Sequence, residues 1–214
     1  MTALFPSWYN TPSLFNNGGI IKLVIGLTGE KLAGKETFVW YLKNVLLNTG
    51  NNKSVVSIRS SDVLIDILKI LGLETTRPNM QNLAIALDEK FGKGTLTRSV
   101  QKRLMETQGN IVIFDGVRWQ SDVKMIRSFP NSVLVYVTAD LKIRYNRAKK
   151  RNEKAGESTL SFEDFKKEEL AATEIYIGEI GKSADFTIVN NNNADEFDNL
   201  REQVRIFYRD FCHR

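Results

Sequence analysis

The stretch Gly29-Glu30-Lys31-Leu32-Ala33-Gly34-Lys35-Glu36-Thr37, entered from the apolar run Leu23-Val24-Ile25, decides how the rest of the chain is interpreted. Two glycines separated by four residues let backbone N–H groups turn inward around phosphate groups, and the following helix directs its partial positive end at them. Lys35 adds a full positive charge at the β- and γ-phosphates. The pattern predicts a loop whose nine residues hold a nucleoside triphosphate.

One position departs from the usual pattern of such a loop. Glu36 stands where a Ser or Thr that ligates magnesium is expected, and Thr37 follows one place later. Thr37 therefore becomes the loop's candidate metal ligand, in place of the residue directly after Lys35.

Composition narrows the class of protein. A length of 214 residues suits one α/β domain, and the net charge of +5 is moderate and dispersed, so anionic small-molecule substrates account for it better than nucleic acid does. The single cysteine, Cys212, cannot form an intramolecular disulfide, which predicts a reduced, cytoplasmic setting. Neither a membrane-spanning run nor a signal peptide is apparent, and a homodimer is left open.

The chain alternates apolar β-type runs with helical patterns, as buried parallel strands require. Residues 1–19 have neither period and are interpreted as an N-terminal arm, and residues 20–214 as one nucleotide-binding domain. The strands are expected at residues 20–27, 54–58, 111–114, 133–137 and 186–189. Helices are expected to begin near residues 35, 62, 79, 95, 121, 141, 162 and 194. The fold class is α/β, a three-layer sandwich around a five-stranded parallel sheet.

Two helical segments are longer than the single helix that usually connects two parallel strands. Residues 62–109 hold several helices between the second and third strands, where phosphotransferases of this architecture hold the acceptor. Residues 141–177 follow the fourth strand and have the position and charge of a lid. Glu168 and Glu169, in this second segment, are interpreted as solvated helix residues.

The third strand ends in Asp115-Gly116-Val117-Arg118. A carboxylate delivered to the carboxyl edge of the sheet lies beside the phosphate loop, where Asp115 can hold magnesium directly or through water. Arg118 projects from the same edge and can clamp an acceptor phosphate with two hydrogen bonds. The structural alternatives are a turn aspartate and a surface arginine paired with Asp122.

Three arginines, Arg144, Arg147 and Arg151, recur at spacings of three and four, which places them on one face of a helix. Positive groups around the γ-phosphoryl in a site from which water is excluded favour phosphoryl transfer, so these arginines are candidate catalytic residues. A solvated charged face is the alternative.

Three further residues are candidates for holding the acceptor. Arg77 precedes a proline-started helix and is a second candidate for the acceptor phosphate, while Gln81, one turn later, could bind a base edge. Asp62, after Ser60-Ser61, either lies in the first turn of a capped helix or points toward the acceptor as a hydrogen-bonding group or general base. A loop arginine and a solvent-facing glutamine are the alternatives for the first two.

With these residues assembled, residues 20–211 resemble the P-loop nucleoside monophosphate kinase-like family. The Gly-Lys-Glu-Thr ending of the loop, Arg77-Pro78 and Asp-Gly-x-Arg resemble deoxynucleoside monophosphate kinases. Gly26-Leu27-Thr28-Gly29 and the segment that starts at Ala184 and ends at Asn190 resemble dephospho-coenzyme A kinase. The resemblance implies a strand order of 2-3-1-4-5, ATP and Mg²⁺ as cofactors, and Asn190 near the adenine.

The sequence thus predicts an ATP-dependent kinase, with a nucleoside or deoxynucleoside monophosphate as the first-choice acceptor. Dephospho-coenzyme A is the second choice. Its ribose hydroxyl must lose a proton, and Asp62 could accept that proton as a general base. A nucleotide-binding regulatory protein without catalysis is the alternative from another class, supported by Glu36 and opposed by the arginines.

Overall fold

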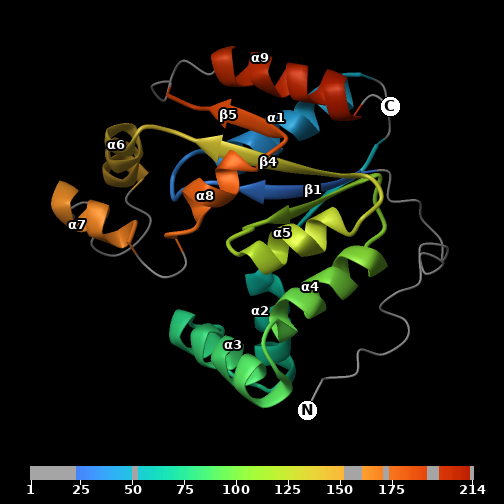
Figure 1. The fold of residues 1–214 in the computed structure, drawn as a ribbon, viewed down its shortest axis with the longest axis vertical. Coiled ribbons are helices and arrows are strands. Elements are labelled where there is room, and N and C mark those ends of the chain that lie inside the picture. Colours follow the sequence, from blue (N-terminus) through green and yellow to red (C-terminus); the bar gives the residue numbers. More distant parts are fainter. Residues whose placement is uncertain (1–22, 50–52, 152–160, 171–173, 192–197, 213–214) are drawn as a thin grey trace.

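A computed structural model describes residues 23–49, 53–151, 161–170, 174–191 and 198–212, without the side chains of Arg77 and Arg151. Its centre is a five-stranded, fully parallel sheet with the order β2-β3-β1-β4-β5 (Figure 1). The strands are β1 (Leu23–Thr28), β2 (Val55–Ile58), β3 (Ile111–Asp115), β4 (Ser132–Thr138) and β5 (Phe186–Val189). The predicted fold class and strand order are confirmed.

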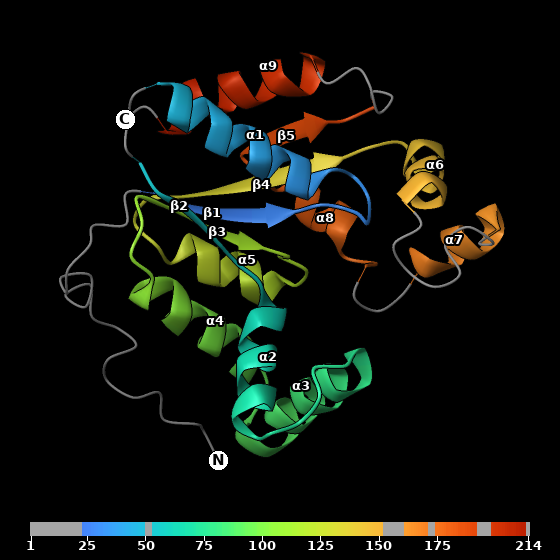
Figure 2. The same cartoon turned by 180° about the vertical axis from the view of Figure 1, so that it is seen from behind.

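Helices cover both faces of this sheet. The described helices are α1 (Lys35–Asn48), α2 (Ser60–Ile70), α3 (Arg77–Phe91), α4 (Thr95–Glu106), α5 (Gln120–Arg127), α6 (Leu141–Arg151), α7 (Phe162–Glu168), α8 (Ile177–Lys182) and α9 (Asp198–Phe207), which a π-helical turn, Tyr208–Cys212, extends. Helices α1 and α9 lie on one face, and α4, α5 and α8 lie on the other (Figures 1 and 2).

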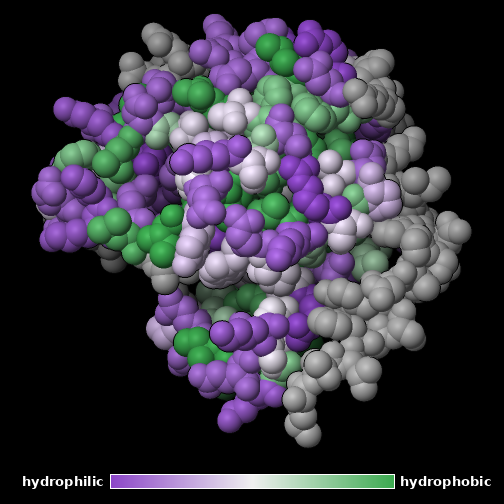
Figure 3. Space-filling view, in the orientation of Figure 1, coloured by the Kyte–Doolittle hydropathy of each residue, from purple (hydrophilic) through white to green (hydrophobic). Residues whose placement is uncertain are grey.

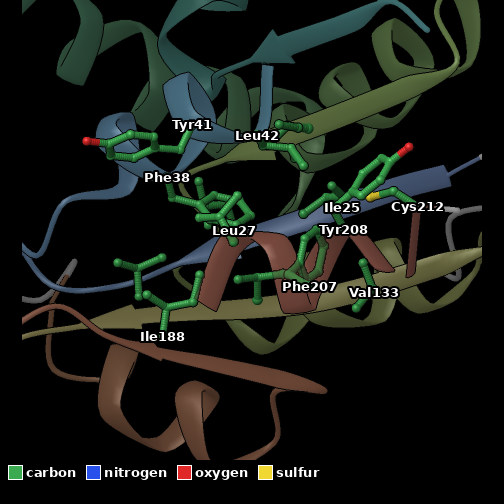
Figure 4. Close-up of a cluster of buried hydrophobic side chains, with 14 of the residues drawn as sticks. Ile25, Leu27, Phe38, Tyr41, Leu42, Val133, Ile188, Phe207, Tyr208 and Cys212 are labelled. Atoms are coloured by element: carbon green, nitrogen blue, oxygen red, sulfur yellow. The ribbon is translucent and has the colours of Figure 1, made fainter. Parts of the chain in front are cut away.

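The two hydrophobic cores explain why the strands are almost continuously apolar. Leu23, Ile25 and Leu27 of β1 face α1 and α9, whereas Val24 between them belongs to the core on the opposite face. Figure 4 shows the first core, in which the Phe38 and Phe207 rings meet edge to face with centroids 5.4 Å apart. Burial on both faces fixes the register of β1, because a one-residue slip would exchange the two sets of side chains.

The register also decides which residues meet at the carboxyl edge of the sheet. Leu27 of β1 pairs with Asp115 of β3, and Ile58 of β2 pairs with Phe114. The segments that follow β1, β3 and β2 therefore begin side by side. Helices α6 and α7 lie beyond this edge, and α2 and α3 extend to one side of the sheet (Figure 2).

The structure differs from the expected elements in a few places. Helix α8 was not predicted, since its six residues include two glycines, and the π-helical turn after α9 has no sequence signal that we recognised. Helices α2, α3 and α5 begin one or two residues earlier than expected. The proposed arm at residues 1–19, the start of the first strand and residue 194 lie outside the described residues.

Polar residues predominate on the face drawn in Figure 3, with hydrophobic residues scattered among them. Within the described ranges, the helices are too short or too polar to cross a membrane.

Candidate active site

The loop between β1 and α1 requires its two glycines. Gly29 and Gly34 have φ angles of 153° and 106°. A Cβ atom on Gly29 would lie 2.1 Å from the Val137 carbonyl oxygen, and one on Gly34 would lie 2.3 Å from the Asn190 amide nitrogen. Conformation and close approach both exclude a larger residue at these positions.

Lys35 is held inside the curve of this loop. Its ammonium group donates hydrogen bonds to the carbonyl oxygens of Gly29 (2.7 Å) and Glu30 (2.9 Å). Burial lowers the pKa of Lys35, an effect that the nearby Asp115 carboxylate partly opposes. A positive charge and the N-terminus of α1 thus lie together, which is the arrangement that binds a phosphate chain.

Asp115, at the end of β3, is nearly buried and forms an ion pair with Arg59, a residue that sequence analysis missed. The Arg59 Nε atom lies 3.1 Å from Asp115 Oδ2, and Nη2 of the same guanidinium lies 3.1 Å from Glu36 Oε1. Arg59 directly follows β2, whose neighbour is β3. The strand order would have pointed to this contact, because it brings the ends of β2 and β3 to the same place.

The Asp62 carboxylate contacts the backbone at the start of its own helix. Its Oδ2 atom accepts a hydrogen bond from the backbone N–H of Arg59 at 2.7 Å, and the Asp62 N–H donates to the Arg59 carbonyl oxygen at 3.1 Å. This reciprocal pair stabilises the first turn of α2. The carboxylate therefore has a structural partner at the position where a base was considered.

Arg118 follows β3 and is positioned by a buried carboxylate. Asp122 Oδ2 accepts hydrogen bonds from the backbone N–H groups of Arg118 (3.0 Å) and Trp119 (3.2 Å), and Asp122 Oδ1 accepts from the Thr97 hydroxyl (3.1 Å). The guanidinium of Arg118 forms an ion pair with Glu174. Asp122 thus contacts the Arg118 backbone, whereas the expected structural alternative was a pair between the two side chains.

Two of the three predicted arginines on α6 contact the phosphate loop from outside. Arg144, which is buried, donates from Nε to the Ala139 carbonyl oxygen at 2.9 Å and from Nη1 to the Lys31 carbonyl oxygen at 3.4 Å. Arg147 donates to the carbonyl oxygens of Leu32 (3.1 Å) and Asn190 (2.7 Å). These guanidinium groups support the backbone of the loop.

Asn190 is buried against the same part of the loop. Its amide nitrogen donates to the Ala33 carbonyl oxygen at 2.8 Å, and its amide oxygen has no hydrogen-bond partner among the described residues. Asn190 therefore connects the segment after β5 to the phosphate loop.

Helix α7 is attached to the loop by charge. Lys31 pairs with Glu168 and lies over the Phe165 ring, with Nζ 5.4 Å from the centroid, and Arg144 pairs with Glu169 at 2.7 Å. Glu168 remains exposed, as expected of a solvated helix residue, although it pairs with Lys31. Glu169 is only 22% exposed and pairs with Arg144, so its interpretation as a solvated residue was wrong. Both carboxylates find basic partners on the loop and on α6, which a single helical period cannot reveal.

Glu30 contributes a further contact inside the site. The Tyr136 hydroxyl of β4 donates to Glu30 Oε1, and burial together with this bond raises the pKa of Tyr136 to about 12. The other oxygen, Oε2, is buried and has no hydrogen-bond partner in the described part of the chain.

The remaining candidates lie on helices α3 and α6. Arg77 is the first residue of α3, and Gln81 lies exposed on the same helix, which extends from the side of the sheet. Arg151 ends α6, and its side chain, like that of Arg77, is outside the described part. Lys35 lies near Asp115, and Arg59 links Asp115 to Glu36. Thr37 lies in the first turn of α1, and Arg118 follows β3.

Comparisons of the sequence with known proteins find relatives that match most of the chain. No family model matches the chain. It is similar to a UPF0200 protein of Methanocaldococcus jannaschii, at 29% identity over 188 residues that cover 85% of this chain and 90% of the relative. A UPF0200 protein of Saccharolobus islandicus is 29% identical over 183 residues, covering 85% and 91%.

Solved structures share the fold at low sequence identity. Shikimate kinase from Bacteroides thetaiotaomicron matches with a TM-score of 0.56 and 13% identity, covering 87% of this chain and 97% of that one. A protein from Eubacterium ventriosum matches with a TM-score of 0.52 and 13% identity, covering 90% and 99%. The chain therefore has a P-loop kinase fold.

Proposed function

We propose that this chain is an ATP-dependent phosphotransferase that converts a nucleoside or deoxynucleoside monophosphate into the diphosphate. The observation that carries the proposal is the loop at the end of β1, in which Lys35 is fixed by two loop carbonyls beside the N-terminus of α1. This group matches the triphosphate of ATP in charge and in hydrogen-bond donors.

The residues around the loop also suit a divalent cation. Thr37 supplies a hydroxyl and Asp115 a carboxylate, and magnesium prefers oxygen ligands of this kind. Magnesium bound there would neutralise charge on the phosphate oxygens during transfer. Among the described residues no group of three or more His, Cys, Asp and Glu side chains surrounds this place, so water and phosphate oxygens would complete its coordination.

Phosphoryl transfer needs little from the protein beyond positioning and positive charge. Lys35 supplies charge at the β- and γ-phosphates, while Arg144 and Arg147 keep the loop's backbone in its curved form through its carbonyl oxygens. We assign Arg118 to the acceptor's phosphate, since the residue lies in the segment after β3 and its guanidinium is already paired with a carboxylate, Glu174, that an anion can replace.

A monophosphate acceptor is consistent with the hydrogen bonding of Asp62. The phosphate oxygen of a monophosphate is already ionised and needs no general base, whereas the ribose hydroxyl of dephospho-coenzyme A must lose a proton. Asp62 Oδ2 is hydrogen-bonded to the backbone of Arg59. This contact favours a role in helix capping over one in proton transfer.

The experiment that tests the proposal is an assay of ADP formation from ATP with a panel of acceptors. The panel contains the ribo- and deoxyribonucleoside monophosphates, dephospho-coenzyme A and shikimate. We expect turnover with at least one monophosphate and none with the other two. Turnover with dephospho-coenzyme A alone would replace the proposed acceptor, and ATP binding without turnover on any acceptor would favour a regulatory protein.

A further inference from the structure

Arg59 forms a bridge at the edge of the site. Its guanidinium contacts two carboxylates that come from different elements, Asp115 at the end of β3 and Glu36 in the first turn of α1, each at 3.1 Å. The guanidinium thereby lies between Glu36, at the position where a phosphate loop usually has its metal ligand, and Asp115, the carboxylate expected to hold the metal.

The bridge is built into the fold. Arg59 begins directly after β2, and its backbone N–H is held by Asp62 Oδ2 at 2.7 Å, so the base of the side chain is fixed. Asp115 is only 9% exposed, and a carboxylate this deeply placed needs a positive or hydrogen-bonding partner. The Arg59 side chain itself is half exposed and has room to move away from the pair.

A divalent cation and a guanidinium would satisfy the same two carboxylates. Both groups bind carboxylate oxygens, and both cannot occupy the same oxygen lone pairs at once. Glu36 has a longer side chain than the Ser or Thr usual at its position, and it can reach either partner. The departure of Glu36 from the usual loop pattern is then explained by its partnership with Arg59.

We propose that Arg59 is an internal counter-ion that competes with a divalent cation for Glu36 and Asp115. Without the cation the guanidinium neutralises both carboxylates, and a cation that binds them displaces it. The inference rests on the proposed function only in placing the cation beside Asp115. It predicts that this protein binds a free divalent cation weakly, because Arg59 must be released first.

The test measures Mn²⁺ binding to the nucleotide-free protein by electron paramagnetic resonance. Arg59→Gln should tighten Mn²⁺ binding by about tenfold or more, since even one charge-assisted hydrogen bond is worth roughly that factor. The matched control is Arg103→Gln. Arg103 pairs with Asp66 of α2 at 2.5 Å, so this variant also removes an arginine from an ion pair, and it should leave the Mn²⁺ affinity unchanged. The gain should disappear in Arg59→Gln combined with Asp115→Asn.

Equal effects of Arg59→Gln and Arg103→Gln on the Mn²⁺ affinity would overturn the proposal. Weaker Mn²⁺ binding in Arg59→Gln, or a gain that survives Asp115→Asn, would overturn it as well.

A second measurement uses the wild-type chain and tests the proposal even if the variant does not fold. In ¹⁵N spectra, the Arg59 Nε–H signal should lose its protection from exchange when Mg²⁺ is added, and an unaltered signal at saturating Mg²⁺ would contradict displacement. Neither measurement involves phosphoryl transfer. Failure of the Arg59 proposal can therefore be distinguished from failure of the proposed kinase function.

Discussion

At the scale of single residues, Gly34 offers a sharp test of the phosphate loop. Gly34→Ala combines an unfavourable φ of 106° with a Cβ atom 2.3 Å from the Asn190 amide nitrogen, whereas Gly72→Ala has a φ of 68° and nothing within 4 Å. Backbone strain alone should cost about 1 kcal/mol in Gly72→Ala, and the displaced Asn190 should raise the cost in Gly34→Ala by roughly 1 to 3 kcal/mol more.

Urea unfolding measures the two costs, and calorimetry measures ATP binding. Only Gly34→Ala should lose ATP affinity. A Gly34→Ala protein with normal stability and normal ATP binding would show that the loop tolerates a side chain at this position and would contradict the prediction.

Asp122 predicts a dependence of stability on pH. Burial raises the pKa of Asp122 above its usual 3.8, although hydrogen bonds from Arg118, Thr97 and Trp119 oppose the shift. A carboxyl with a raised pKa in the folded state favours folding when protonated, so this contribution is present below pH 3.8 and is lost as pH rises through the folded pKa.

Asp122→Asn keeps one acceptor oxygen, replaces the other with an amide donor, and does not titrate. The free energy of unfolding of the wild type, relative to Asp122→Asn, should therefore fall as pH rises from 3.8 through the folded pKa and stay constant at higher pH. Denaturant titrations across this range measure it. A difference that grows with rising pH would mean that the hydrogen bonds outweigh burial.

The residues predicted from sequence are those whose chemistry is set by neighbours in the chain. Lys35 and the two glycines belong to one continuous pattern, and Asp115 follows its own strand. Arg59 was missed because its partners Glu36 and Asp115 are 23 and 56 positions away, and only the order of the strands brings them together. Pairing across the sheet is not contained in any local spacing.

At the scale of elements, helix α2 separates two roles for Asp62. Asp62→Ala removes the acceptor of the Arg59 N–H group and should cost about 1 kcal/mol of stability, while Asp62→Asn keeps an acceptor oxygen and should cost less. If capping is the residue's main role, turnover in Asp62→Asn should fall less than about tenfold.

A general base predicts a different result for the same variant. Loss of a base lowers turnover by roughly 100-fold or more without a matching loss of stability. Steady-state kinetics and thermal unfolding of both Asp62 variants distinguish the two cases. A 100-fold loss in Asp62→Asn would contradict the capping role and favour a hydroxyl acceptor.

The elements around the site were only partly predictable. The helical segment from residue 141 was expected to be a lid whose arginines surround the γ-phosphoryl group. In the structure, Arg144 and Arg147 contact loop carbonyls, and α7 contacts Lys31. Spacing places arginines on one face of a helix and does not say what that face meets. The packing of α6 and α7 against the loop depends on contacts between distant parts of the chain.

At the scale of the whole molecule, the alternation of apolar runs and helical patterns predicted a parallel sheet covered by helices, and the resemblance to P-loop kinases supplied the strand order. Strands buried on both faces have few alternatives to a parallel sheet with helical crossovers, and the loop after the first strand identifies the edge where the site forms. The acceptor is not fixed at this scale, since related architectures hold different acceptors on similar sheets.

The central claim is that this chain transfers the γ-phosphoryl group of ATP and that Lys35 is essential for the transfer. The most direct measurement follows ³²P from [γ-³²P]ATP into the nucleoside monophosphates, with the wild type, Lys35→Ala and Lys43→Ala, whose lysine is exposed on α1. Label should appear in a nucleoside diphosphate with the wild type and Lys43→Ala, and should fall by roughly hundreds-fold or more in Lys35→Ala. Equal transfer by Lys35→Ala and the wild type, or no transfer to any monophosphate, would contradict the account.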